Sequence, residues 1–148
     1  METGDFNILL ADDDEDDCMF FKAVLNELSL PASLKTVGNG VELMDFLKNN
    51  ASNLPNVLFL DLNMPCKNGF DCLLEIKQLE KLKQLPIIIY STSSNPDEMD
   101  RLFDKGAQYY IRKPADFSNL KKVIHKAILL TLQKALARPL REDFLIHP

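Results

Sequence analysis

Three carboxylates stand directly after two apolar stretches of this chain. Asp12 and Asp13 follow the run 8–11, and Asp61 follows the run 57–60. Each run is long enough for a buried strand, and a charged residue at the carboxyl end of such a strand points into a site. If the two strands are parallel neighbours, the three carboxylates crowd together and repel one another. A bound dication would relieve that repulsion.

A hydroxyl and an ammonium follow two further apolar runs. Ser91 ends the run 87–90, and Lys113 stands just after the run 109–111. Carboxylate oxygens with room left for water suit Mg²⁺, which takes one or two carboxylates together with phosphate oxygens. A phosphoryl group on one carboxylate could be held by the metal, the ammonium and the hydroxyl, each on one of its equatorial oxygens.

The spacing of the acids indicates which carboxylate accepts the group. Asp12 and Asp13 are adjacent and fit metal binding, whereas Asp61 stands singly at the end of its strand. We therefore assign Asp61 as the acceptor. The acids of 14–17 have a simpler explanation, because carboxylates in the first turn of a helix are favoured by the helix dipole.

The rest of the chain predicts the elements that position these groups. Apolar runs alternate with segments of helical period, which predicts an α/β fold with a doubly wound, five-stranded parallel sheet and five helices. Helix starts are indicated at Asn39 and Asn95, and a helix end at Gly106. The predicted strands lie near 7–11, 33–37, 57–61, 86–90 and 108–111, and the predicted helices near 15–28, 41–49, 69–81, 97–105 and 117–137.

Length and composition narrow the class of protein. The 148 residues predict one domain over 6–136 and a short tail over 137–148, with no output domain. The net charge of −5 argues against a nucleic-acid partner, since phosphate binding needs a basic field. No apolar stretch reaches the ~18 residues of a membrane span, and the three cysteines lack a metal spacing. We expect a cytoplasmic protein with reduced thiols and no membrane association.

At these motifs the chain resembles the response-regulator receiver domain of two-component signalling, over about residues 6–135. The motifs are the pair Asp12-Asp13, the run DLNMP from Asp61 with Gly69 after it, Ser91-Thr92, and the run 110–114. Within the family, the chain is most similar to the compact single-domain kind that includes cyanobacterial phytochrome response regulators. The resemblance implies a flavodoxin-like sheet of strand order 2-1-3-4-5.

The resemblance also implies a function. A sensor histidine kinase or a histidine phosphotransfer protein would transfer a phosphoryl group to Asp61 in the presence of Mg²⁺. Asp13, Asp61 and the backbone carbonyl of Asn63 would bind the metal, with Asp12 contributing through water. The protein would be a phosphoacceptor that promotes its own phosphorylation and autodephosphorylation, and not an enzyme acting on a separate substrate.

Conformational switching is implied in the same way. Ser91 would turn toward the aspartyl phosphate, and Tyr110 would swing inward behind it. The resemblance places Lys113 beside the phosphate, followed by a cis peptide bond to Pro114. A homodimer through the fourth helix, the fifth strand and the last helix would be one output. The surplus leucines of the last helix, Leu129 and Leu132 among them, suggest this interface or one with another partner. Alternatively, they cover the sheet edge or pack against 144–146.

Two other functions share parts of this pattern. Asp12 and Asp14 form an Asp-x-Asp after the first strand, as in phosphohydrolases of the haloacid-dehalogenase kind. That family needs a second acidic pair after the lysine, whereas only the isolated Asp116 and Asp143 follow Lys113. A docking module that is never phosphorylated is the third hypothesis, and the complete set of acids and lysine argues against it.

Overall fold

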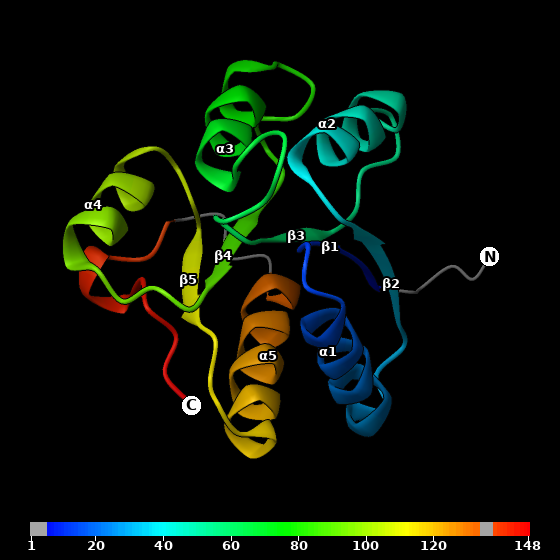
Figure 1. Ribbon diagram of the computed structural model, residues 1–148, viewed down its shortest axis with the longest axis vertical. Helices are drawn as coiled ribbons and strands as arrows, with labels where there is room; N and C mark the ends of the chain where they lie inside the picture. Colours follow the sequence, from blue (N-terminus) through cyan, green and yellow to red (C-terminus); the bar gives the residue numbers. More distant parts are fainter. Residues whose placement is uncertain (1–5, 134–137) are drawn as a thin grey trace.

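A computed structural model describes residues 6–133 and 138–148. Its five strands are parallel and lie in the order β2-β1-β3-β4-β5, which confirms the expected flavodoxin-like sheet. Helices α1 and α5 cover one face of the sheet, and α2, α3 and α4 cover the other (Figure 1). The strands are β1 Phe6–Ala11, β2 Ala32–Val37, β3 Val57–Leu60, β4 Ile87–Ser91 and β5 Tyr109–Arg112. The helices are α1 Glu15–Leu28, α2 Gly40–Asn49, α3 Gly69–Gln78, α4 Pro96–Asp104 and α5 Phe117–Leu132.

The central strands supply a hydrophobic core on each face of the sheet. Along β3, Leu58 and Leu60 pack toward α2 and α3, whereas Phe59 packs toward α1 and α5. The ring of Phe59 meets that of Phe21 on α1 edge-on, with centroids 4.9 Å apart. Because both faces of such a strand are buried, its sequence is apolar without alternation. This is why the acids that end the runs stand out.

Side-chain caps fix the helix starts that the sequence indicated. Asn39 accepts a hydrogen bond from the backbone N–H of Glu42 at the start of α2. Asn95 caps α4 in the same way, and Gly106 follows that helix with a φ of +102°. These short-range signals predict boundaries well, because a cap bonds only to its own first turn.

Two helices differ from the predicted ranges by more than one residue, α3 and α5. The predicted 69–81 helix ends at Gln78, where Leu79 takes an extended conformation. The chain then turns so that Leu82 and Leu85 are buried, and this burial outweighs the helical period of the sequence. The last helix is described to Leu132, and the predicted residues 134–137 lie outside the described part of the chain.

The C-terminal segment 138–148 packs against β5 and α4, where it is drawn in red in Figure 1. The backbone N–H of Tyr110 donates to the Phe144 carbonyl, and the N–H of Ile146 donates to the Tyr110 carbonyl, both at 2.9 Å. Phe144 is fully buried, with its ring 5.2 Å from that of Phe103 on α4. The tail therefore covers the outer edge of β5, which would otherwise expose unpaired backbone groups.

Replacing Phe144 by Ala should destabilise the fold. The substitution removes a buried ring between α4 and β5, which costs about 3–5 kcal/mol of unfolding free energy. The check is urea unfolding of Phe144→Ala beside Leu140→Ala, because Leu140 belongs to the same tail and is 64% exposed. Equal stabilities of the two variants would contradict the packing of the tail on the core.

Candidate functional site

Strand register brings the predicted carboxylates together. Ala11 of β1 pairs with Leu60 of β3, and the N–H of Asp61 donates to the Ala11 carbonyl at 2.9 Å. One carboxylate oxygen from each of Asp12, Asp13 and Asp61 lies within 4.8 Å of the others. Asp12 and Asp61 are buried, whereas Asp13 is exposed to solvent.

Lys113 reaches the same point from the end of β5. Its Nζ lies 2.8 Å from an oxygen of Asp12 and 3.8 Å from an oxygen of Asp61. It also lies 2.8 Å from an oxygen of Asp17, in the first turn of α1. The first-turn explanation is therefore incomplete for Asp17. The signal that could have found it is the position of α1, which begins directly after the acidic pair at the same edge of the sheet.

Burial and neighbouring charges shift the pKa values of Asp61 and Lys113. Burial raises the pKa of Asp61 to about 7; the ammonium of Lys113 opposes this shift, and the charge of Asp12 adds to it. Burial alone would lower the pKa of Lys113, but hydrogen bonds to Asp12 and Asp17 and the charge of Asp61 raise it. Three carboxylates lie within 4 Å of the ammonium and Asp13 lies beside two of them, so the acids outnumber the cation and further positive charge would be favourable here.

Backbone N–H groups orient two of the carboxylates. Asp12 accepts from the N–H of Asp14 at 3.0 Å, and Asp61 accepts from the N–H of Asn63 at 3.4 Å. Asn63 thus lies next to the Asp61 carboxylate. The use of its carbonyl as a metal ligand stays a prediction.

Ser91 is the last residue of β4 and Tyr110 is the second residue of β5, and both are fully buried. The Ser91 hydroxyl accepts from the N–H of Ser93 at 3.2 Å, and the Tyr110 hydroxyl donates to the Ser93 carbonyl at 2.8 Å. Burial raises the pKa of Tyr110, and the neighbouring Ser91 hydroxyl opposes the shift. Tyr110 thus points inward, while its movement and that of Ser91 stay predictions.

The peptide bond between Lys113 and Pro114 is trans, so the expected cis bond is wrong. None of the described residues forms a cis peptide bond. The trans form is the lower in free energy for an X-Pro bond by about 0.5–1 kcal/mol. In this conformation Lys113 already reaches the carboxylates, so the contact does not depend on a cis bond.

Gly69 holds the loop that follows Asp61 close to the start of α3. Its N–H donates to the Leu62 carbonyl at 3.0 Å, directly after Asp61. A Cβ on Gly69 would lie 2.9 Å from the Leu62 Cα and closer still to the Asp61 carbonyl oxygen. Only a glycine allows this approach of the helix start to the end of β3.

Replacing Gly69 by Ala should therefore displace the loop between Asp61 and α3. We expect a loss of roughly 1–3 kcal/mol in the free energy of unfolding, because the added methyl group meets fixed backbone. Gly38→Ala is the matched control, since a Cβ there would meet only the Glu42 Oε1 at 3.8 Å. Chemical denaturation measures both variants, and equal effects would argue against a special role of Gly69.

Comparison with known proteins agrees with this geometry. The model of the response regulator receiver domain family matches residues 8–125. The response regulator Rcp1 of Synechocystis sp. is 31% identical over 121 residues, which cover 79% of this chain and 82% of Rcp1. The crystal structure of the phosphorylated cyanobacterial phytochrome response regulator RcpA is 30% identical, with a TM-score of 0.81 over 93% of this chain and 100% of RcpA. The Mn²⁺-bound form of Rcp1 is 29% identical, with a TM-score of 0.75 over 90% of this chain and 99% of that one. Sequence, fold and site together show that this chain belongs to the response regulator receiver domains of two-component signalling.

Proposed function

We propose that Asp61 is the phosphoacceptor of this receiver domain. The observation that carries the proposal is the buried Asp61 carboxylate, with two more carboxylates and the Lys113 ammonium at the same edge of the sheet. An anionic carboxylate at that place is a nucleophile for phosphorus, and the nearby cation can stabilise the charge of the incoming phosphoryl oxygens.

The donor atoms fit Mg²⁺, which is the metal expected from the sequence. Three carboxylate oxygens lie close together and one of the three residues is open to solvent, so there is room for water ligands. Asp12, Asp13, Asp61 and the Asn63 carbonyl would hold the ion. When bound, it would neutralise charge on the phosphoryl oxygens. The similarity to the Mn²⁺-bound form of Rcp1 supports a divalent cation at this pocket.

The side chains of this chain have separate roles in the transfer. An oxygen of Asp61 forms the new bond to phosphorus while the bond from phosphorus to the donor breaks. Lys113 would contact one phosphoryl oxygen, since its Nζ is already 3.8 Å from Asp61. The Ser91 hydroxyl would leave the N–H of Ser93 and donate to another oxygen. Tyr110 is already inward, so the space behind Ser91 is filled.

The same groups would let the domain promote both its own phosphorylation and its autodephosphorylation. In the second reaction, water attacks phosphorus and the bond to Asp61 breaks, which restores the carboxylate. The domain would therefore turn over its own phosphate without acting on a separate substrate. The family comparisons give no support to the phosphohydrolase alternative. The hypothesis of a docking module that is never phosphorylated gives no function to the acids clustered around Lys113.

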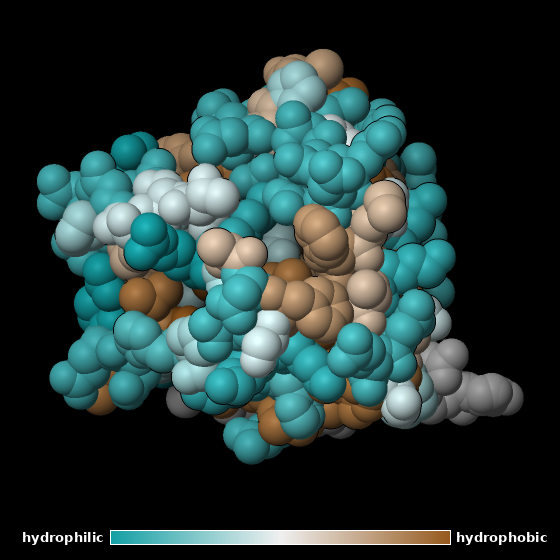
Figure 2. All heavy atoms as spheres, turned by 60° about the horizontal axis from the view of Figure 1, so that its bottom comes forward, coloured by the Kyte–Doolittle hydropathy of each residue, from teal (hydrophilic) through white to brown (hydrophobic). Residues whose placement is uncertain are grey.

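A sensor histidine kinase or a histidine phosphotransfer protein is the proposed donor. Receiver domains take their phosphoryl group from histidine kinases, and the donor must approach the exposed side of the site. Met19 and Phe20 of α1 have exposed fractions of 67% and 52%. Met19 lies close to the site, because it is five residues after the helix cap Asp14, which is ~7.5 Å along the helix axis. Figure 2 turns the lower side of Figure 1 forward and shows apolar side chains there among polar ones. We propose the Met19 and Phe20 surface as the contact for the donor.

The homodimer expected from the sequence remains a proposal in a narrower form. The tail covers the edge of β5, so the contact would use α4 and α5 and not strand pairing. Leu129 and Leu132 of α5 are 43% and 48% exposed, while Phe144 and Ile146 of the tail are buried. These two leucines are the apolar groups that such a dimer would cover.

The domain boundaries and the location of the protein are proposals as well. We propose that the receiver domain spans 6–136, that the residues after it form a tail, and that the protein acts in the cytoplasm without nucleic acid. Within the described residues, no helix has the length and apolar character that crossing a membrane requires.

Incubation with a small-molecule phosphodonor and Mg²⁺ tests the acceptor. We expect one addition of ~80 Da in the intact mass of the wild-type protein, lost in Asp61→Asn and in the presence of a chelator. Asp16→Asn is the control, because Asp16 is an exposed acid of α1 outside the cluster. An addition that persists in Asp61→Asn would place the phosphoryl group elsewhere.

Mg²⁺ binding can be measured separately from phosphorylation. At ten times Kd, Mg²⁺ should stabilise the wild-type fold by about 1.4 kcal/mol, which raises Tm by roughly 3–6 °C for a chain of this size. Asp13→Asn should need at least about tenfold more Mg²⁺ for the same stabilisation, because the substitution removes the charge of one ligand. Asp16→Asn should match the wild type. Equal Mg²⁺ responses of the two variants would rule out the cluster as the metal site.

A further inference from the structure

A cavity of about 440 Å³ lies at the edge of the sheet opposite Asp61. Phe6 at the start of β1, Pro86 just before β4 and Tyr109 at the start of β5 line it. The proposed phosphoryl transfer makes no use of these residues, since the acids and Lys113 follow the other ends of the strands. A volume of this size is in the range of small-molecule sites.

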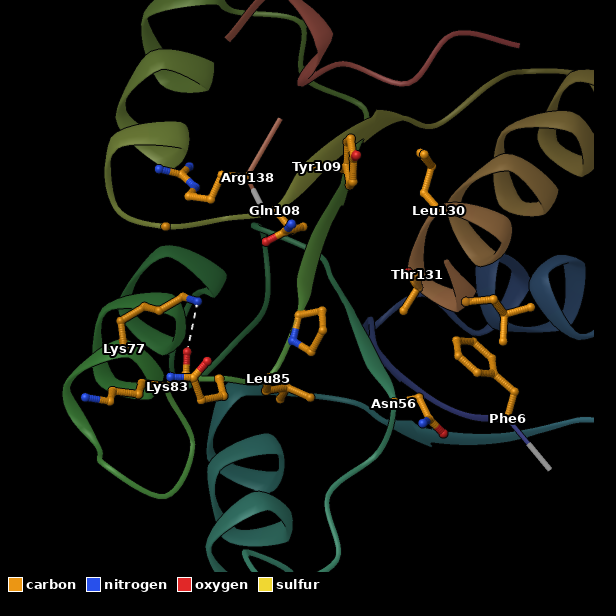
Figure 3. A pocket seen from close by; sticks show the side chains of 14 residues that line it. Phe6, Asn56, Lys77, Lys83, Leu85, Gln108, Tyr109, Leu130, Thr131 and Arg138 are labelled. Atoms are coloured by element: carbon orange, nitrogen blue, oxygen red, sulfur yellow. Dashed lines mark hydrogen bonds between the residues drawn. The ribbon is translucent and has the colours of Figure 1, made fainter. Parts of the chain in front are cut away.

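The charges around this cavity have one sign. Lys77, Lys83 and Arg138 line it, and none of its described lining residues is acidic, although the chain has a net charge of −5. Lys83 is accounted for, because it pairs with Glu80 at 2.7 Å and its side chain is directed away from the cavity (Figure 3). Lys77 and Arg138 are therefore the cations that a ligand would meet.

Carbonyl groups, and not carboxylates, hold these two cations. The ammonium of Lys77 donates to the Lys83 carbonyl at 3.2 Å, which is the dashed line in Figure 3. Arg138 donates to the carbonyls of Phe103 and Ala107. Within 6–133 and 138–148, neither cation forms an ion pair with a carboxylate. Burial and the charge of Arg138 both lower the pKa of Lys77, so the ammonium lacks a compensating anion.

The other wall of the cavity is apolar. Figure 3 shows Phe6, Leu130 and Thr131 across from Lys77 and Arg138. Leu85 and Pro86 supply further apolar surface between the two walls. A ligand that fits both walls has an anionic head and an apolar body. A carboxylate head suits the pair, because its two oxygens can accept from an ammonium and a guanidinium together.

We propose that this cavity binds a small carboxylate with an apolar body. The head pairs with Lys77 and Arg138, and the body packs against Phe6, Pro86 and Leu130. The ligand would contact α3, α5 and the starts of β1 and β5 at once. The proposal does not depend on phosphorylation of Asp61, which is at the opposite edge.

Calorimetric titration of the full chain with sodium octanoate tests the proposal. We expect saturable binding of one octanoate per chain. Octanol, which lacks the charge, and acetate, which lacks the apolar body, should each bind at least about tenfold more weakly. If octanol binds as tightly as octanoate, the cavity recognises only the apolar body. If acetate binds as tightly as octanoate, the cavity recognises only the negative charge. Either result overturns the proposal.

A pair of lysine variants locates the site. Lys77→Met keeps most of the apolar stem and removes the charge, so octanoate affinity should fall at least about tenfold. Lys81→Met is the matched control, because Lys81 is exposed just beyond α3 and does not line the cavity; its affinity should stay within about twofold. Backbone amide shifts on titration should concentrate at Gly106 and Gln108. No saturation by ~10 mM octanoate, or equal affinities of the two variants, would overturn the proposal.

Discussion

The contact of the Lys113 ammonium with the carboxylates of three separate segments is the interaction on which the site depends. Asp12 follows β1, Asp61 follows β3, Asp17 belongs to α1, and Lys113 follows β5. One cation among these acids lowers their mutual repulsion without removing it, so the cluster keeps an affinity for more positive charge. The parallel sheet is what makes the contact available, because it brings the carboxyl ends of its strands to one edge.

Tyr110 joins this site to the C-terminal tail. Its hydroxyl donates to the Ser93 carbonyl beside Ser91, while its backbone pairs with Phe144 and Ile146. The tail in turn contacts α4, since Arg141 donates to Asp100 at 2.7 Å and Phe144 packs on Phe103. Tyr110, α4 and the tail are therefore packed as one unit, and the tail takes the place that a neighbouring strand would have beside β5.

The two edges of the sheet carry opposite charge in a chain whose acids and bases are also unevenly distributed. The acids of the N-terminal segment gather at the carboxyl edge around Lys113, where we propose that a cation and a phosphoryl group bind. At the amino edge, Lys77 and Arg138 meet apolar side chains without an acidic neighbour among the described lining residues. Opposite ends of the same strands thus present different chemistry.

The sequence by itself determined the alternation of strands and helices, the caps at Asn39 and Asn95, and the acids that end two buried runs, because each depends on residues close together in the chain. With the family resemblance it also indicated the strand order and which carboxylates meet. Only the tertiary structure decided that Asp17 pairs with Lys113, 96 residues away, that α3 ends at Gln78, and that the tail pairs with β5. The cavity at Lys77 and Arg138 likewise joins distant segments. Such contacts depend on which surfaces are buried against each other, and local patterns of hydrophobicity and charge do not contain that information.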